Sequence, residues 1–154
     1  MIRRACKEDI PAILELLVQV DMVHHLGRPD LFKGPATKYT ADQLEKILRD
    51  DAAPVFVCER NGKIAGHAFC MHQQTSGDNV LQDVKTLYID DICVHEACRK
   101  QGVGRELYEY VLEYARTCGF YNVTLNVWSC NPGALKFYES LGMKPYKTGM
   151  EQIL

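Results

Sequence analysis

The chain has 154 residues, of which 25% are charged, and a formal net charge of −2. This length is typical of one domain with a single hydrophobic core, so we expect residues 1–154 to form one domain. A chain so close to neutral lacks the overall basic surface that binds nucleic acid independently of sequence. We therefore expect no nucleic-acid partner.

Seven cysteines are scattered along the chain and form no Cys-x-x-Cys pair. Such a set is typical of reduced, mostly buried thiols rather than of a disulfide framework or a zinc site. The segment Met1–Asp9 is charged where a secretion signal would be apolar, and no run approaches the ~20 apolar residues of a membrane span. We expect a cytoplasmic protein with no metal and no membrane partner, and we leave homodimer formation open.

The first third of the chain predicts a strand and two helices. Residues 2–5 form a short strand-like run, and from Ile10 to Val20 the apolar residues have helical spacing. Residues 21–38 predict a loop because glycine and proline recur in them. Thr40 is a suitable N-cap for a further helix through Leu48.

Three strands follow in the middle of the chain. Residues 53–59 and 63–73 have strand-like composition, and Asn61-Gly62 between them is a strong signal for a two-residue hairpin turn. After a polar turn at 74–79, the run 86–94 predicts a third strand that pairs antiparallel with the second.

The last third predicts a long helix ending at Gly119, a strand over 122–128, a short helix over 133–141 and a final strand or strand pair over 143–153. The full order of elements is typical of an α+β (mixed α/β) domain rather than of a doubly wound parallel sheet. We expect one central mixed, mostly antiparallel sheet flanked by helices.

The segment Arg99-Lys100-Gln101-Gly102-Val103-Gly104 joins the strand 86–94 to the long helix. Its two glycines leave backbone N–H groups unobstructed at a helix N-terminus, where free amides and the helix dipole favour an anion. The spacing matches neither a P-loop nor a dinucleotide-binding fingerprint. The segment predicts either a diphosphate site or a simple change of chain direction.

With its flanks, this turn resembles the signature of the GNAT superfamily of acyl-CoA-dependent N-acetyltransferases. That signature, (Gln/Arg)-x-x-Gly-x-(Gly/Ala) after an apolar-x-Val strand end, is matched here by Ile92-Cys93-Val94 and Arg99–Gly104. Residues 131–144 resemble the family's Asn-x-x-Ala-x-x-Phe-Tyr-x-x-x-Gly-Phe, and residues 2–13 are similar to its first strand and helix. The resemblance implies a GNAT-like fold and an enzyme that uses acetyl-CoA as co-substrate, without a metal, to acetylate a primary amine.

The resemblance also implies which residues bind the coenzyme. The backbone amides of Ile92, Cys93 and Val94 hold the acyl carbonyl and the pantetheine arm. The phosphate-contacting and remaining coenzyme-contacting residues are Arg99, Lys100, Gln101, Gly102, Val103, Gly104, Arg105 and Asn131. Three of these residues also fit a purely structural role: Cys93 as a buried strand cysteine, Asn131 as a helix N-cap, and Arg105 as an ion-pair partner of Glu109.

Tyr138 and Asp90 are the candidate catalytic residues. Tyr138 occupies the family's Phe-Tyr position, where a phenol can protonate the departing thiolate, although it is also suited to packing. Asp90 lies in an apolar strand, where a carboxylate is costly unless it has a partner or faces water. It shares strand parity with Ile92 and is the candidate base, whereas Asp91 is expected to point to the opposite side and also fits a structural cap. Asp91 or water remains an alternative base, and a bulge would change the parity assignment.

The acceptor side is predicted less specifically, with Asp90, Asn126, His24 and His25 as candidate substrate-binding residues. Similar protein N-acetyltransferases of the bacterial ribosomal type often carry glutamate at the position of Asn126, which favours a small-molecule amine here. A peptide or protein acceptor is an alternative. A second alternative is a non-catalytic acyl-CoA-binding regulatory module.

Overall fold

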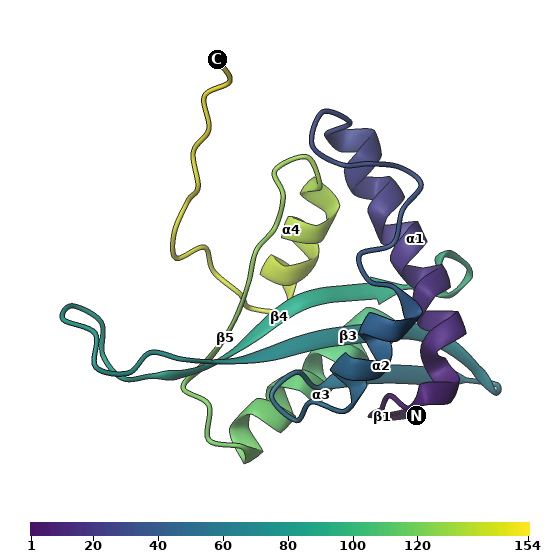
Figure 1. Cartoon of the computed structure of the whole chain (residues 1–154), viewed down its shortest axis with the longest axis horizontal. Coiled ribbons are helices and arrows are strands. Elements are labelled where there is room, and N and C mark those ends of the chain that lie inside the picture. The colour runs from purple at the N-terminus through teal and green to yellow at the C-terminus, as the bar shows by residue number, and fades with distance from the viewer.

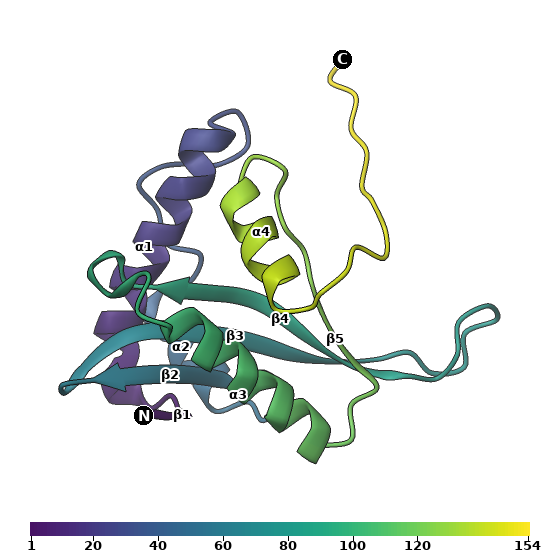
Figure 2. The same ribbon diagram turned by 180° about the vertical axis from the view of Figure 1, so that it is seen from behind.

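The computed structural model describes residues 1–154 and contains one five-stranded sheet with helices on both faces (Figures 1 and 2). The strands, which are adjacent in chain order, are β1 (Ile2–Arg4), β2 (Val55–Arg60), β3 (Lys63–Gln74), β4 (Lys85–Val94) and β5 (Asn122–Leu125). The helices are α1 (Ile10–Gly27), α2 (Ala41–Leu48), α3 (Val103–Thr117) and α4 (Pro132–Ser140), with short 3-10 turns at Lys7–Asp9 and Glu96–Cys98. Neighbouring strands are antiparallel except β4 and β5, which are parallel, so the mixed, mostly antiparallel sheet is confirmed.

The β2–β3 hairpin turns at Asn61 and Gly62, as predicted. Both residues have positive φ, at 50° and 72°, and this conformation suits asparagine and glycine. A turn of this hand matches the right-handed twist of the two strands that it joins. Thr40 is confirmed as the N-cap of α2, because its hydroxyl accepts a hydrogen bond from the N–H of Gln43 at 3.2 Å.

The sheet separates two hydrophobic clusters. On one face, α3 packs Leu107 and Val111 against Cys70 and Leu87 of the sheet, and residues of α4 join the edge of this cluster. On the other face, Ile13 and Leu17 of α1 and Leu44 of α2 pack against Val55, Val57 and Phe69. We call these the α3 face and the α1 face. The two faces are seen from opposite sides in Figures 1 and 2.

Helix α1 is longer than the sequence predicts, because residues 21–27, expected in a loop, continue it to Gly27. The loop prediction was wrong over these residues. Met22, Val23 and Leu26 are compatible with a helix, and the first strong breakers are Gly27 itself and Pro29. His24 and His25 therefore lie on the last turn of a helix.

The segment Lys7–Gly27 has the length and apolar composition of a membrane-crossing helix, with a mean hydropathy of 1.2, contrary to our expectation that no such run exists. In the fold, its most apolar positions face the sheet, where Ile13, Leu16 and Leu17 are almost fully buried. A helix that covers a sheet needs the same apolar composition, which accounts for the hydropathy of this segment.

The C-terminal segment, residues 143–154, forms no strand, so the predicted final strand or strand pair is absent. Residues 144–154 make no backbone–backbone hydrogen bond, and the segment extends away from the sheet beyond α4 (Figure 1). A strand needs the backbone of a neighbour, and β5, expected to reach residue 128, ends at Leu125. Apolar residues alone do not make this segment a strand.

Candidate active site

A bulge in β4 sets the direction of the two aspartates. Phe69 of β3 pairs with Asp91 and Cys70 pairs with Ile89, so Asp90 is an extra residue without a partner on β3. Ile89 and Ile92 consequently both pack on the α3 face. Asp90 and Asp91 both have their hydrogen-bond partners on the α1 face. The parity prediction was wrong on this point, because an extra residue reverses the alternation of a strand.

The end of β4 has a free backbone edge. Strand β5 pairs with β4 only from Thr86 to Ile89 and then leads away toward α4, as Figure 2 shows. Residues 91–94 are paired with β3 on one side, and residues 90–94 have no strand on the other. The backbone of Ile92, Cys93 and Val94 therefore has one edge without a strand partner, where an extended ligand can hydrogen-bond as an added strand does.

The turn after β4 presents a row of free backbone donors. Gly102 has a φ of +83° and Lys100 a φ of +61°. The first hydrogen bond of α3 runs from the N–H of Glu106 to the carbonyl of Gly102, and the N–H groups of residues 101–105 donate no hydrogen bond within the chain. Free N–H groups at a helix N-terminus form a site for an anion.

The two positions of this turn that hold glycine require it for different structural reasons. A Cβ on Gly102 would have only Glu106 nearby, at 3.7 Å, so its positive φ is what requires glycine. A Cβ on Gly104 would lie 3.1 Å from the ring of Phe137, so close packing of α3 against α4 limits this position.

The charged residues of the turn have separate contacts. Arg99 donates from Nε to the carbonyl of Val94 at 3.3 Å, and Gln101 donates to the carbonyl of Ala97 at 3.0 Å. Arg105 lies 3.7 Å from Glu109 one turn along α3, which is the pairing left open by the sequence. Lys100 makes no ion pair. Arg99 and Gln101 therefore brace the turn.

Tyr138 lies on α4, inside the edge of the α3-face cluster. Its ring is 6.3 Å from that of Tyr108 and 5.1 Å from that of Phe137. Burial raises the pKa of the phenol above its usual value, and the negative charge of Asp91 raises it further. Asn131 caps the same helix by accepting from the N–H of Ala134 at 3.2 Å.

Asp91 forms the most buried polar pair near the site. His67 has no exposed surface, and its Nε2 lies 2.7 Å from a carboxylate oxygen of Asp91, whose side chain is 14% exposed. A carboxylate can only accept, so the imidazole donates from Nε2. The Nδ1 of His67 has no partner and is buried. The imidazole thus holds Asp91 in one orientation at the free edge of β4.

Asp90 is held by a different pair of residues. It accepts from Lys38 Nζ at 2.7 Å and from the Tyr39 hydroxyl at 3.0 Å. Burial raises the pKa of Tyr39, with further contributions from the charges of Asp90 and Asp91 and from Tyr88. Lys38, Tyr39 and Asp90 therefore form one hydrogen-bonded group on the α1 face.

Cys93 is an unreactive thiol in this arrangement. Its side chain is buried and donates to the carbonyl of Leu16 at 3.4 Å. Burial raises the pKa of the thiol to about 12. His95, two residues along the chain, contacts Glu15 at 3.2 Å. Cys93 can contribute its backbone but is poorly suited to be a nucleophile.

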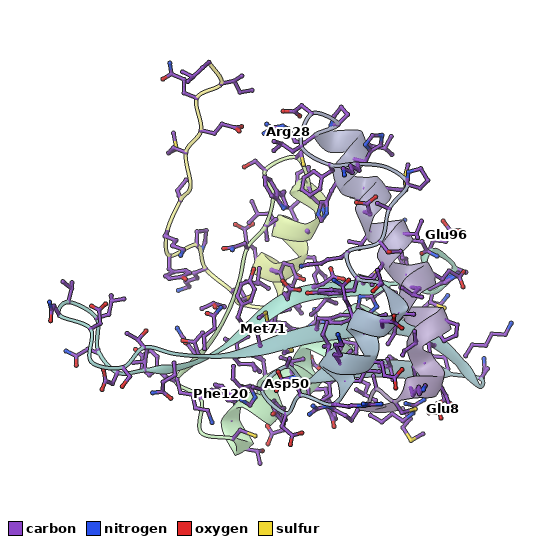
Figure 3. All side chains as sticks on the ribbon, in the orientation of Figure 1. Glu8, Arg28, Asp50, Met71, Glu96 and Phe120 are labelled. Atoms are coloured by element: carbon purple, nitrogen blue, oxygen red, sulfur yellow. The ribbon has the colours of Figure 1, made fainter.

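The two histidines at the end of α1 contact the loop that follows this helix. His25 donates from Nδ1 to the carbonyl of Phe32 at 2.7 Å, and His24 stacks on the Phe32 ring at 5.0 Å. Phe32 in turn contacts Trp128 edge to face at 5.0 Å. Arg28, just past the end of α1 (Figure 3), pairs with Glu151 of the C-terminal segment at 2.7 Å.

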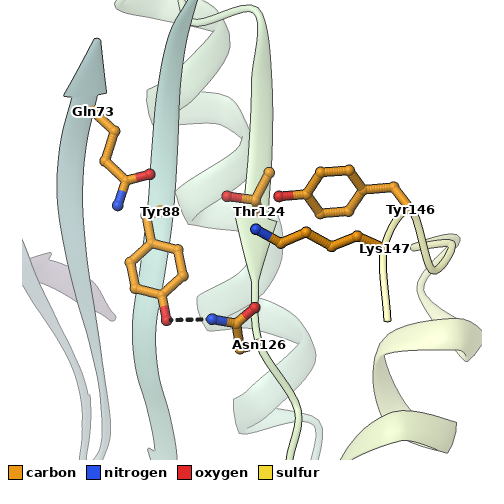
Figure 4. A pocket seen from close by; sticks show the side chains of 6 residues that line it. All are labelled: Gln73, Tyr88, Thr124, Asn126, Tyr146 and Lys147. Atoms are coloured by element: carbon orange, nitrogen blue, oxygen red, sulfur yellow. Dashed lines mark hydrogen bonds between the residues drawn. The ribbon is translucent and has the colours of Figure 1, made fainter. Parts of the chain in front are cut away.

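A pocket of about 320 Å³ lies on the α1 face beside the place where β4 and β5 separate (Figure 4). Its lining consists of Gln73, Tyr88, Thr124, Asn126, Tyr146 and Lys147. Asn126 donates from its amide to the Tyr88 hydroxyl at 3.3 Å, as the dashed line in Figure 4 shows. Of the predicted acceptor residues, Asn126 is in this pocket and His24 and His25 are not. No group of three or more His, Cys, Asp or Glu side chains is placed to hold a metal.

Several residues of the site cannot be identified from the local sequence pattern. His67 is one histidine within a strand, and its pairing with Asp91 depends on strand register. Lys38 and Tyr39 precede the N-cap of α2, and Tyr146 and Lys147 belong to the segment expected to be a strand. Only the alternation of Tyr88 with buried Leu87 and Ile89 could have suggested that Tyr88 faces a site.

Comparisons with known proteins agree with this geometry. The family model described as Acetyltransferase (GNAT) family matches residues 20–143. The uncharacterized N-acetyltransferase MJ1207 of Methanocaldococcus jannaschii is 29% identical over 143 residues, which are 93% of this chain and 60% of that protein, so the chain spans less than two thirds of this relative. The ribosomal protein bS18-alanine N-acetyltransferase of Escherichia coli K12 is 30% identical over 119 residues, 77% of this chain and 70% of that protein.

A solved structure has nearly the same fold. The x-ray structure of a tetramutant of the BH1408 protein from Bacillus halodurans has a TM-score of 0.95 and 30% sequence identity, covering 100% of this chain and 99% of that one. The free edge of β4, the donor-rich turn before α3 and the family match are mutually consistent. The chain belongs to the GNAT family of acetyltransferases.

Proposed function

We propose that the protein transfers an acetyl group from acetyl-CoA to a primary amine of a small molecule, by direct attack of the amine on the thioester. The observation that carries this proposal is the continuity between two backbone features. The free edge of β4 over residues 90–94 is followed, after the 3-10 turn at Glu96–Cys98, by the turn whose N–H groups at 101–105 are free. A ligand with an extended arm attached to a diphosphate can bind both features at once, with the arm along the strand edge and the diphosphate at the turn.

The backbone holds most of the coenzyme in this proposal. Ile92, Cys93 and Val94 bind the pantetheine arm along the strand edge, and residues 101–105 bind the diphosphate with the help of the helix dipole. Lys100 is the charged side chain of the turn that is free to contact phosphate. Asn131 is held in place as the cap of α4.

Asp91 is the group that we place beside the reacting amine. Asp90, the candidate from the sequence, has its charge engaged by Lys38 and a Tyr39 hydrogen bond. Asp91 contacts His67 and pairs with no lysine or arginine, so its negative charge is available to an ammonium group. When the nitrogen attacks the carbonyl carbon it becomes acidic, and the carboxylate takes its proton.

Tyr138 supplies the proton to the departing thiolate. A phenol whose pKa is raised stays protonated at neutral and moderately alkaline pH, so it is ready to donate. Because the thioester is already activated, positioning by the backbone accounts for much of the rate and few catalytic side chains are needed.

A small acceptor is favoured by contacts between the loop after α1, the segment after β5 and the C-terminal segment. The contact between Phe32 and Trp128 joins the loop after α1 to the segment after β5, and Arg28 ties the C-terminal segment to the same loop. We expect these links between three segments to limit the size of the acceptor. The similarity to the ribosomal protein bS18-alanine N-acetyltransferase keeps a protein N-terminus as the second candidate acceptor.

Thiol release from acetyl-CoA, measured across a panel of amines, tests the proposal. The panel includes small primary amines and a peptide with an N-terminal alanine, and acetyl-CoA binding is measured in parallel by calorimetry. Thiol release with a small amine is the expected result. Release with the peptide alone would identify a protein acetyltransferase. Binding without any release would identify a non-catalytic coenzyme-binding module.

A further inference from the structure

The charge of the residues that line the pocket in Figure 4 indicates which chemical group the pocket binds. Lys147 is the only charged residue of the lining, and the other five residues are neutral and polar. The ammonium group of Lys147 makes no ion pair and lies 5.6 Å from the centre of the Tyr146 ring. A pocket with a cation and no carboxylate attracts a negative group.

The neutral residues can complete the coordination of that group. The Tyr88 oxygen accepts from Asn126, which leaves its O–H free to donate. Gln73 and Thr124 each add a donor from a neighbouring strand, and Tyr146 adds another from the C-terminal segment. Figure 4 shows the side chains of Tyr146 and Lys147 extending toward the strands from the opposite side. A carboxylate uses several such donors at once.

The pocket and the aspartates lie on one face of the sheet. Tyr88 pairs with Met71 and Asp91 pairs with Phe69, and these two β3 residues are on the same side of their strand. Asp91 is three residues beyond Tyr88, and Asp90 is two. The distance along the strand from Tyr88 to the aspartates is therefore roughly 7–10 Å. One extended molecule can reach from the aspartates to Lys147.

We propose that the pocket around Lys147 binds a carboxylate of the acceptor, so that the acceptor is an amine with a carboxylate several bonds from the reacting nitrogen. This inference rests on the proposed acetyl transfer and specifies its substrate class. The amine end lies at Asp91 and the acid end at Lys147. A polyamine would place a second cation against Lys147 and is therefore a poor acceptor.

Three amines of similar length test the inference: 6-aminohexanoate, 6-aminohexanamide and 1,5-diaminopentane, which end in an anion, a neutral amide and a cation. We expect kcat/KM for the acid to exceed that for the amide by about tenfold, as for a charge-assisted hydrogen bond, with the diamine lowest. In Lys147→Gln the acid and the amide become equal, and in Lys147→Glu the diamine becomes the best of the three. Lys144→Gln, which removes the same charge outside the pocket, is the control and keeps the parental ratio.

A binding measurement separates this inference from the proposed enzyme activity. Calorimetry compares 6-acetamidohexanoate with 6-acetamidohexanamide on the protein saturated with coenzyme A. Tighter binding of the acid, lost in Lys147→Gln and kept in Lys144→Gln, supports the carboxylate site even if no amine releases thiol. Equal binding of the acid and the amide to the parent protein, or an acid preference that survives in Lys147→Gln, would overturn it.

Discussion

Tyr138 is the residue for which chemistry and packing are hardest to separate, because it lies in a hydrophobic cluster and yet carries a phenol. Tyr138→Phe keeps the ring and removes the proton. If the phenol protonates the thiolate, kcat falls by roughly 10²–10⁴ where that step limits turnover, while acetyl-CoA affinity changes little. Steady-state kinetics and calorimetry on the two proteins measure this. An unchanged kcat with chemistry rate-limiting would leave Tyr138 as a packing residue.

The pH profile of kcat gives a second test of Tyr138. Burial and the charge of Asp91 both oppose formation of the phenolate, so the pKa is raised. The phenol must be protonated to act, so activity persists at pH values where an ordinary tyrosine, with a pKa of about 10, is already ionised. We expect no loss of kcat from this group between about pH 8 and 10. A fall within that range that is absent in Tyr138→Phe would contradict the raised pKa.

The adjacent residues Asp90 and Asp91 form a matched pair for testing the base. Each substitution to asparagine preserves size and removes one charge. Asp91→Asn is expected to lower kcat/KM for a cationic amine by at least about tenfold, and Asp90→Asn by less, because the charge of Asp90 already binds Lys38. Initial rates with one amine at several pH values measure both. A larger effect at Asp90 would restore the residue that the sequence favoured as the base.

At the scale of elements, the turn before α3 depends on one backbone conformation. Gly102→Val forces a branched side chain into a positive φ at the proposed diphosphate site. We expect acetyl-CoA binding to weaken by about tenfold or more, with the fold retained. Calorimetry measures the affinity, and thermal unfolding reports the stability.

Gly77→Val is a matched control for that strain. Gly77 also has a positive φ, at 65°, and a Cβ there would meet nothing within 4 Å. It lies in the β3–β4 connection, outside the residues assigned to the coenzyme site. Both variants should lose stability, by about 1–2 kcal/mol from the unfavourable backbone conformation, but only Gly102→Val should lose coenzyme affinity. Equal affinity losses would remove the diphosphate assignment.

At the scale of the whole molecule, one polar cluster joins β1, β2 and the start of α1. Arg3 of β1 donates to both carboxylate oxygens of Asp9, at 2.7 and 2.9 Å, and also contacts Glu59 of β2. Asp9 is buried and in addition accepts from the N–H of Cys6 at 2.9 Å. The hydrogen bond from Arg3 is the main reason that the pKa of Asp9 is lowered.

Asp9→Asn should therefore destabilise the protein at neutral pH. Arg3 is one third exposed, so the expected loss is about 2 kcal/mol, as for hydrogen bonds to a charged group, or roughly 4–8 °C in Tm. Because the folded-state pKa is below the unfolded value, this stabilisation is present above about pH 4 and disappears as pH falls through the folded pKa. Thermal unfolding of both proteins at neutral pH and at about pH 3 measures the difference. A gap in Tm that is as large in acid as at neutral pH would contradict this origin.

The sequence alone determined the features that depend on neighbours in the chain. The Asn61-Gly62 hairpin, the Thr40 cap, the alternation of elements and the glycine turn at Gly102 were all predicted, because turn and cap chemistry acts over a few residues. The resemblance to the GNAT family rests mainly on two such short segments, residues 92–104 and 131–144, with residues 2–13 in addition. The α+β sheet followed from the order of these elements.

The tertiary structure decided everything that depends on pairing between distant segments. The bulge at Asp90 exists because β3 and β4 shift register, and it places both aspartates on one face. The divergence of β5 from β4 opens the strand edge at residues 90–94. The pocket joins Gln73, Tyr88 and Asn126 to Lys147 from segments far apart in the chain. Backbone pairing and side-chain packing across such separations are set by the whole fold, so no local pattern in the sequence can specify them.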